Sequence, residues 1–372
     1  MRALGRESET RAGKIAPRVQ RKNSNRLICL LCLFLLGIPL AAQAQSEAVY
    51  RLGRFSFENG GEIADMKVGY VTWGALNAAK DNAVLLLPGS SNGRHFADAH
   101  IGPGKTYDTD RYFVIAVDPI GGGNSSSPKD GPGRDFPEYT IRDMVRAQYA
   151  LITQGLGLTR LLAVGGPSMG SFQSLEWGIL YPDFVTGLIL IVPAARMDRH
   201  FAPVMEALEA MIRLDPEYRD GKYRSPPLAG LRGAALVFFP WIVSDAYLAT
   251  LDEAAYQKAK TALGEAWAKE WDANSLLSRF RASSRYDAAK PFGGDMAKAL
   301  ARVKARALLL ACPTDRTVPA YLTKELYRGL PNAVYEEIPS SRGHLAGVMP
   351  PGTAEYDYVS EKVKSFLALL PR

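Results

Sequence analysis

Gly166, Ser168 and Gly170 form a G-x-S-x-G pattern that places a serine where it could act as a nucleophile. The short apolar run Leu161–Val164 precedes the pattern and apolar residues at helical spacing follow it, which predicts a strand before the serine and a helix after it. On such a sharp turn the hydroxyl points into a cleft, and the flanking glycines are needed because a Cβ would collide with the strand or the helix. The pattern alone is loose in a chain with 34 glycines. Ser168 therefore needs a base and an acid elsewhere in the sequence.

A serine hydroxyl is a weak nucleophile and needs a base that is itself oriented by a third group. The chain has four histidines: His95, His100, His200 and His344. On a strand-to-helix turn of this kind, the partners follow in the chain order serine, acid, histidine. Only His344 lies far enough downstream, in a glycine-containing loop after the last predicted strand. His200 is expected on the surface or on a helical insertion, and a role toward substrate stays open for the other two histidines.

Asp315 is the candidate acid because it stands in the loop directly after the predicted strand Ala305–Ala311. The carboxyl ends of parallel strands meet along one edge of a sheet, where Ser168 and His344 are also expected. In an alternative interpretation Asp315 is a turn residue that caps the helix after Pro319. Three candidate residues, each at the end of a separate predicted strand, favour a Ser168–Asp315–His344 triad.

An oxyanion formed during attack on a carbonyl needs two N–H donors, and the first is expected to be Met169, the residue after the nucleophile. The second should come from the loop that follows the third predicted strand. Pro88 in this loop has no N–H to donate. Leu87 or Ser90 is the expected second donor, and Gly89 is left open.

Eight segments are predicted to be strands, and most of them alternate with helical patterns. The apolar runs of the interior segments are unbroken, which suits strands that are covered on both faces of a parallel sheet. The sequence therefore predicts an α/β fold with a mainly parallel, doubly wound sheet. The predicted strands are Tyr50–Phe57, Met66–Trp73, Ala83–Leu87, Tyr112–Val117, Leu161–Val164, Val185–Val192, Ala305–Ala311 and Ala333–Ile338.

The strand pattern is interrupted from about residue 195 to residue 285, where amphipathic helical patterns dominate. These patterns cover Ala202–Ile212, Ala234–Val243 and Ala254–Trp271. Pro226, Pro227 and Pro240 are expected to break helices in this region. We predict a single catalytic domain over residues 45–372, with residues 195–285 as a helical lid over the site.

The first 44 residues have the features of a secretory signal peptide. A basic stretch precedes the apolar run Leu27–Leu40, and the sequence ending at Ala44 is an A-x-A cleavage site. The run is shorter than the roughly 18 residues of a membrane span, which argues against the alternative of an uncleaved anchor. We expect cleavage after Ala44, export to the periplasm or the medium, and no stable membrane association of the mature chain.

Charge and cysteine content exclude other classes of function. Residues 1–44 carry +6 of the net charge of +7, so the remaining chain is nearly neutral and no nucleic-acid partner is expected. Cys312 is the one cysteine after the signal, so the mature chain has neither an internal disulfide nor a C-x-x-C metal site. No metal or cofactor is implied. The expected partner is a small-molecule ester or acyl compound, and a homodimer is left open.

Several blocks of the sequence resemble the homoserine O-acetyltransferase family of α/β-hydrolase-fold enzymes. The most specific are the GPGK motif at Ile101–Lys105 and DTDRYFVI at Asp108–Ile115, and the blocks Gly166–Trp177 and Asp272–Ser275 are also similar. The resemblance runs from about Tyr50 to the C-terminus. It implies a Ser-His-Asp enzyme that passes an acyl group through a covalent serine ester, under a helical lid that encloses the acceptor. The family's triad carries over onto Ser168, Asp315 and His344.

Three positions depart from this family, and one of them, Pro167 in place of the usual small residue before the serine, is not expected to inactivate the enzyme. The other two concern the acceptor. Members that use homoserine have an aspartate after the catalytic histidine, which contacts the acceptor's amino group, and here that residue is Leu345. They also have a lid arginine for the acceptor's carboxylate, where this chain has Ala235 with Arg232 three residues earlier. Burying both charges without partners would cost several kcal/mol.

Homoserine and acyl-CoA are cytoplasmic metabolites, which an exported enzyme would not meet. We therefore predict an exported serine hydrolase with water, or an unidentified alcohol, as acceptor. The alternative is a homoserine O-acetyltransferase or a related acyltransferase to an amino alcohol. A non-catalytic binding protein is a third class, and the complete triad argues against it.

Overall fold

The strands of the chain form one eight-stranded sheet in the order β1-β2-β4-β3-β5-β6-β7-β8. The computed structural model describes residues 45–372, so the predicted signal peptide in residues 1–44 lies outside the described part. β2 pairs antiparallel with β1 and β4, and the other strand pairs are parallel, which confirms the predicted doubly wound α/β sheet. The strands are β1 (Ser46–Ser56), β2 (Glu62–Trp73), β3 (Ala83–Leu86), β4 (Phe113–Val117), β5 (Leu161–Pro167), β6 (Val185–Ile191), β7 (Arg306–Ala311) and β8 (Ala333–Glu337).

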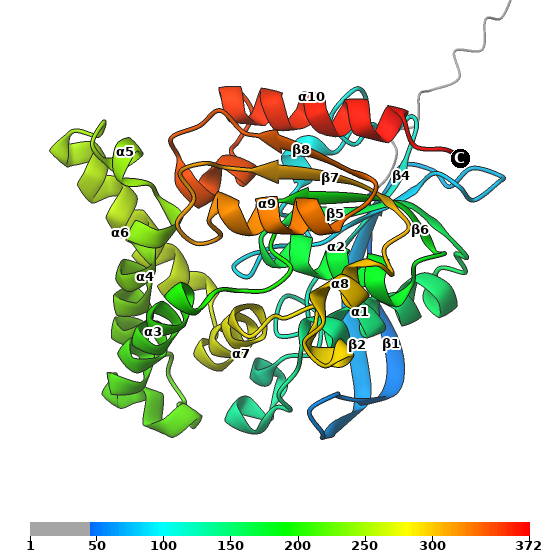
Figure 1. Ribbon diagram of the computed structural model, residues 1–372. Coiled ribbons are helices and arrows are strands. Elements are labelled where there is room, and N and C mark those ends of the chain that lie inside the picture. Colours follow the sequence, from blue (N-terminus) through cyan, green and yellow to red (C-terminus); the bar gives the residue numbers. More distant parts are fainter. Residues whose placement is uncertain (1–44) are drawn as a thin grey trace, which may run out of the picture. The chain divides into compact units, whose positions relative to one another are not determined.

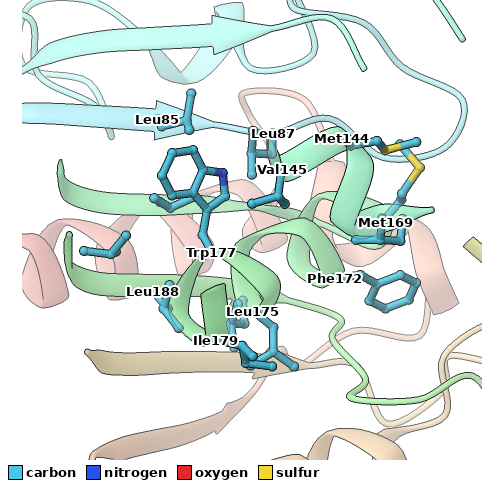
Figure 2. Close-up of a cluster of buried hydrophobic side chains, with 14 of the residues drawn as sticks. Leu85, Leu87, Met144, Val145, Met169, Phe172, Leu175, Trp177, Ile179 and Leu188 are labelled. Carbon is cyan, nitrogen blue, oxygen red and sulfur yellow. The ribbon is translucent and has the colours of Figure 1, made fainter. Parts of the chain in front are cut away.

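Alternate residues of the central strands enter two hydrophobic layers on opposite faces of the sheet. Leu85 of β3 belongs to a layer with α1 and α2, whereas Leu86 belongs to a layer with α10. Figure 1 shows α10 crossing one face of the sheet while α2 and α9 cover the other. Figure 2 shows side chains of β3, α1 and α2 meeting in the first layer, with Trp177 of α2 near its centre. The helices are α1 (Ile141–Ala150), α2 (Met169–Leu180), α8 (Met296–Leu300), α9 (Ala320–Gly329) and α10 (Ala354–Ala368).

Helices α3 to α7 lie between β6 and β7 in the sequence, and α3 to α6 gather beside the sheet (Figure 1). They have a hydrophobic cluster of their own, in which the rings of Phe238, Trp267 and Phe280 are mutual neighbours. Their bounds are α3 (Ala202–Leu214), α4 (Leu228–Ile242), α5 (Asp245–Leu248), α6 (Glu253–Glu270) and α7 (Ala273–Ser284). We call residues 195–285 the lid.

One prediction about the lid was wrong, because Pro240 lies inside α4 instead of breaking it. A proline removes one intrahelical hydrogen bond, and in the last turn of a helix few bonds follow it. Among residues 45–372, no helix has the length and hydrophobicity needed to cross a membrane.

Candidate active site

Ser168 stands on a strained turn between β5 and α2. Its backbone has φ 54° and ψ −122°, a positive φ that residues with a Cβ seldom adopt. Gly166 and Gly170 allow the turn, since a Cβ added to either would lie 1.9 or 2.0 Å from the carbonyl oxygen of Leu87. The two glycines are therefore required because the end of β3 passes directly beneath the turn.

Asp315 and His344 are brought together from the loops that follow β7 and β8. Nδ1 of His344 lies 2.7 Å from Oδ2 of Asp315, and the carboxylate is buried. The other carboxylate oxygen, Oδ1, accepts the backbone N–H groups of Thr317 at 2.8 Å and Val318 at 3.0 Å. Asp315 is thus a turn residue through this oxygen, but it does not cap α9, which begins after Pro319 without a side-chain cap, so that part of the alternative interpretation was wrong. The other oxygen binds the histidine. The carboxylate holds Nδ1, so Nε2 is the nitrogen available as a base.

Ser168 and His344 line the same pocket, which has a free volume of about 90 Å³. Among the described residues no direct hydrogen bond joins them, and such bonds are often long in an enzyme without its substrate. The lid supplies the apolar wall of the pocket with Phe201, Phe238, Ile242, Leu263, Trp267 and Phe280. No sequence motif marks these residues as part of a site, although Phe238 and Ile242 lie four apart on one face of α4.

A larger cavity of about 410 Å³ lies beside α1 and α2, but it contains neither the serine nor the histidine. Its innermost carboxylate belongs to Glu176, whose pKa is raised to about 7 because the side chain is buried. Arg142 partly offsets this effect, with Nη1 lying 3.2 Å from Oε2 of Glu176. The position of the nucleophile, and not cavity size, identifies the smaller pocket as the candidate site.

Leu87 is not available as an oxyanion donor, so that prediction was wrong. Its N–H donates to the carbonyl oxygen of Gly165 at 2.8 Å, because the hydrogen-bond ladder between β3 and β5 extends to this residue. Met169 is the first residue of α2 and has no acceptor for its N–H within the helix. Ser90 and Gly89 line the pocket, and within residues 45–372 neither of their N–H groups donates a hydrogen bond. Met169 with Ser90 or Gly89 therefore makes the candidate oxyanion hole.

The other three histidines lie outside this pocket. His200 is at the entry to α3, with Nε2 3.1 Å from the carbonyl oxygen of Arg316. His95 is exposed. His100 is half-buried and shares a 2.9 Å hydrogen bond with Thr106, and its burial, with a smaller effect of Lys105, lowers its pKa to about 4. In the part of the chain that the structure describes, no group of His, Cys, Asp or Glu residues could hold a metal ion.

Neither Leu345 nor Ala235, the two positions that depart from the homoserine-using members, places a charged side chain in the pocket. Leu345 lines the pocket next to His344. Ala235 is fully buried in the hydrophobic cluster of the lid. Arg232 is directed away and pairs with Glu265 of α6, with 2.7 Å between Nε and Oε1. Arg232 therefore does not replace the missing arginine.

The sheet, the serine turn and the loops after β7 and β8 define an α/β-hydrolase-fold protein. Residues 82–348 match the family described as the alpha/beta hydrolase fold. The homoserine O-acetyltransferase of Trichormus variabilis is 34% identical over 78% of this chain and 87% of its own length. The homoserine O-succinyltransferase of Paraburkholderia xenovorans is 30% identical over 78% of this chain and 88% of its own.

An acetylester hydrolase from Corynebacterium glutamicum is a similar solved structure, with a TM-score of 0.81 and 27% identity over 87% of this chain and 96% of its own. The chain belongs to the homoserine O-acetyltransferase family, as its sequence motifs predicted. It is an enzyme of the α/β-hydrolase acyltransferase type.

Proposed function

We propose that the protein cleaves short, uncharged acyl esters through an acyl-enzyme on Ser168 and passes the acyl group to an uncharged acceptor, water or a simple alcohol. The observation that carries the proposal is the lining of the site pocket. Within the described residues, the side chains lining it include no carboxylate, ammonium or guanidinium group. An amino-acid acceptor would bury an ammonium and a carboxylate there without partners, at a cost of several kcal/mol.

The reaction follows from the positions of the groups. Oγ of Ser168 attacks the ester carbonyl while Nε2 of His344 takes its proton, and Oδ2 of Asp315 holds Nδ1 and stabilises the imidazolium. The oxyanion accepts N–H bonds from Met169 and from Ser90 or Gly89. The imidazolium then protonates the departing alcohol, which leaves an acyl-serine. Water or an alcohol, deprotonated by Nε2, attacks the acyl-serine and releases the product.

The free volume of about 90 Å³ limits the size of the substrate. Pockets for drug-sized ligands usually have roughly 300 to 1,000 Å³, so a short acyl chain fits here and a long one does not. The wall that sets this limit consists of packed aromatic rings from the lid, including Phe238, Trp267 and Phe280.

Acyl transfer to homoserine is the second candidate function. The curated relatives are homoserine O-acyltransferases by name, and on this ground they favour the acyltransferase alternative over the hydrolase prediction. The acetylester hydrolase among the similar structures supports ester cleavage instead. The uncharged pocket with Leu345 is our reason for preferring an uncharged acceptor.

Export stays part of the proposal. Its support is the basic stretch, the apolar run Leu27–Leu40 and the cleavage site at Ala44. The intact mass of the exported protein checks it, and a mature chain that retains residues 27–40 would contradict it.

Purified enzyme should hydrolyse p-nitrophenyl acetate and should release no CoA from acetyl-CoA on addition of homoserine. Because the lid rings limit the space, kcat/KM for the acetate should exceed that for the octanoate by at least about tenfold. Absorbance of p-nitrophenolate and a thiol assay for CoA measure the two reactions. CoA release that depends on homoserine would overturn the proposed acceptor in favour of the second candidate.

The substitution Leu345→Asp should create acceptance of homoserine, because Leu345 lines the pocket next to His344. The new carboxylate supplies a partner for the ammonium, and a charge-assisted hydrogen bond of this kind contributes about 1.5–3 kcal/mol. Homoserine-dependent CoA release should rise at least about tenfold above wild type. Leu345→Asn is the matched uncharged control. Equal rates for the two variants would show that charge at position 345 does not select the acceptor.

A further inference from the structure

The lid is hydrogen-bonded to the three loops that carry Asp315, His344 and the second candidate oxyanion donor. Oγ1 of Thr317, beside Asp315, donates to the carbonyl oxygen of Trp241 in α4 at 2.9 Å. The hydroxyl of Ser244, directly before α5, donates to the carbonyl oxygen of Ser341 in the histidine loop. Further hydrogen bonds come from α7 and reach residues Gly89–Asn92. This loop holds the second candidate oxyanion donor, and we call it the oxyanion loop. The lid is therefore bonded to the loop of the acid, the loop of the histidine and the oxyanion loop.

Helix α7 is hydrogen-bonded to the oxyanion loop at two points. Oγ of Ser283 shares a 2.8 Å hydrogen bond with Oγ of Ser90, and Nη1 of Arg279 donates to the carbonyl oxygen of Asn92 at 2.8 Å. Residues 279 and 283 are four apart, so they lie on the same face of the helix. The loop is also closed on itself, since the N–H of Asn92 donates to the carbonyl oxygen of Gly89 at 3.2 Å. Both candidate N–H donors, Gly89 and Ser90, lie within this bonded segment.

The guanidinium of Arg279 is a buried charge without a carboxylate partner among the described residues, which is unusual for a residue with a purely structural role. Its side chain is 2% exposed, and within residues 45–372 it forms no ion pair with a carboxylate. Trp271 stacks on the guanidinium at 4.0 Å, and Nε has no hydrogen-bond partner in the described part of the chain. Burial lowers its pKa to about 10, so the group stays charged near neutral pH.

Gly122 leaves room for this guanidinium, because a Cβ there would lie 2.9 Å from Nη1. The nearby carboxylate of Asp118 is bound to Arg94, with 2.5 Å between Oδ2 and Nη1. An unpaired positive charge therefore lies behind the oxyanion loop. In a protein interior such a charge favours negative charge on the far side of the loop.

We propose that Ser283 and Arg279 are positioning residues, which hold the Gly89–Asn92 loop against α7 so that its N–H points at the oxyanion. On this basis the lid is a fixed part of the active site and not a flap that opens over it. The inference rests on the proposed function, because the oxyanion belongs to the acyl-transfer step. A misplaced donor weakens binding of the transition state more than binding of the ester, so kcat should change and KM should not.

The test is Ser283→Ala in the full protein. With p-nitrophenyl acetate we expect kcat to fall about tenfold while KM stays within about twofold. Ser283→Thr, which keeps a hydroxyl, should recover most of the loss. Arg279→Met should also lower kcat, and Arg279→Lys, which keeps the charge, should lower it less. The matched control is Ser278→Ala. Ser283 donates its hydroxyl one turn back along α7, to the carbonyl oxygen of Arg279 at 3.1 Å, and Ser278 does the same to Asn274 at 2.8 Å, but Ser278 does not touch the loop.

Labelling of Ser168 by a fluorophosphonate is a second readout, which needs no knowledge of the natural ester. The labelling rate should fall in Ser283→Ala in parallel with kcat. A variant labelled at the wild-type rate, or an equal loss in Ser278→Ala, would overturn the positioning role while leaving the proposed function intact. A wild-type protein that labels but does not hydrolyse esters would defeat the proposed hydrolysis, and the labelling rates would still decide the positioning role.

Discussion

Replacing Ser168 with alanine should abolish ester hydrolysis, with a fall in kcat of at least about 10⁴-fold. The reason is that no acyl-serine can form, whereas the oxyanion donors and the pocket persist. Purified Ser168→Ala should keep the wild-type melting temperature to within a few degrees or exceed it, because the strained backbone at φ 54° loses nothing by the change. Initial rates with p-nitrophenyl acetate and a thermal melt measure the two quantities.

Ser174→Ala is the matched control for this variant. Ser174 also lies on α2, is buried, and donates its hydroxyl to the carbonyl oxygen of Gly170 at 2.8 Å, but it does not line the site pocket. Its hydrolysis rate should stay within about threefold of wild type. Hydrolysis that survives in Ser168→Ala would show that another group performs the chemistry.

Gly170→Ala should destabilise the protein by at least about 3 kcal/mol, or prevent folding, and should remove activity with it. The new Cβ would lie 2.0 Å from the carbonyl oxygen and 2.9 Å from the carbonyl carbon of Leu87. These are backbone atoms at the end of a buried strand, so the end of β3 and the oxyanion loop after it would have to move. Urea unfolding followed by circular dichroism measures the loss.

A helical glycine elsewhere separates this clash from the general effect of adding a methyl group. Gly264 lies inside α6, where the nearest atom to an added Cβ is 3.8 Å away. Gly264→Ala should leave stability unchanged or raise it by up to about 1 kcal/mol, because alanine favours helix. A Gly170→Ala variant as stable as wild type would mean that the turn is looser than its contacts indicate.

The sheet and the contact between Asp315 and His344 could be predicted from the order of simple signals along the chain. Unbroken apolar runs predicted the interior strands, and chain order left His344 and Asp315 as partners for Ser168. The sequence could not decide whether Asp315 is a turn residue or the partner of His344, because the same carboxylate does both. Oδ1 accepts an N–H group of its own turn and Oδ2 binds His344.

The errors and omissions depend on contacts between distant segments. Leu87 looked free because the sequence does not show how far the ladder to β5 extends, and Gly165 takes its N–H. Arg279 and Ser283 carried no signal for the same reason, since their partners lie almost 200 residues earlier in the chain.

The contacts of the lid also bear on how such enzymes can be re-engineered. Lid exchange is an attractive way to give one catalytic core a new substrate range, and it treats the insertion as a module. Here a transplanted helix in the place of α7 would have to make the hydrogen bonds of Ser283 and Arg279 to the oxyanion loop. The rest of the transplanted lid would have to make those of Trp241 and Ser244 to the loops of the acid and the histidine. A transplanted lid that is chosen only for its pocket wall would change substrate binding. Without these hydrogen bonds it would also leave the oxyanion loop misplaced and lower kcat. On this proposal, the lid of this chain determines both the substrate range and the catalytic rate.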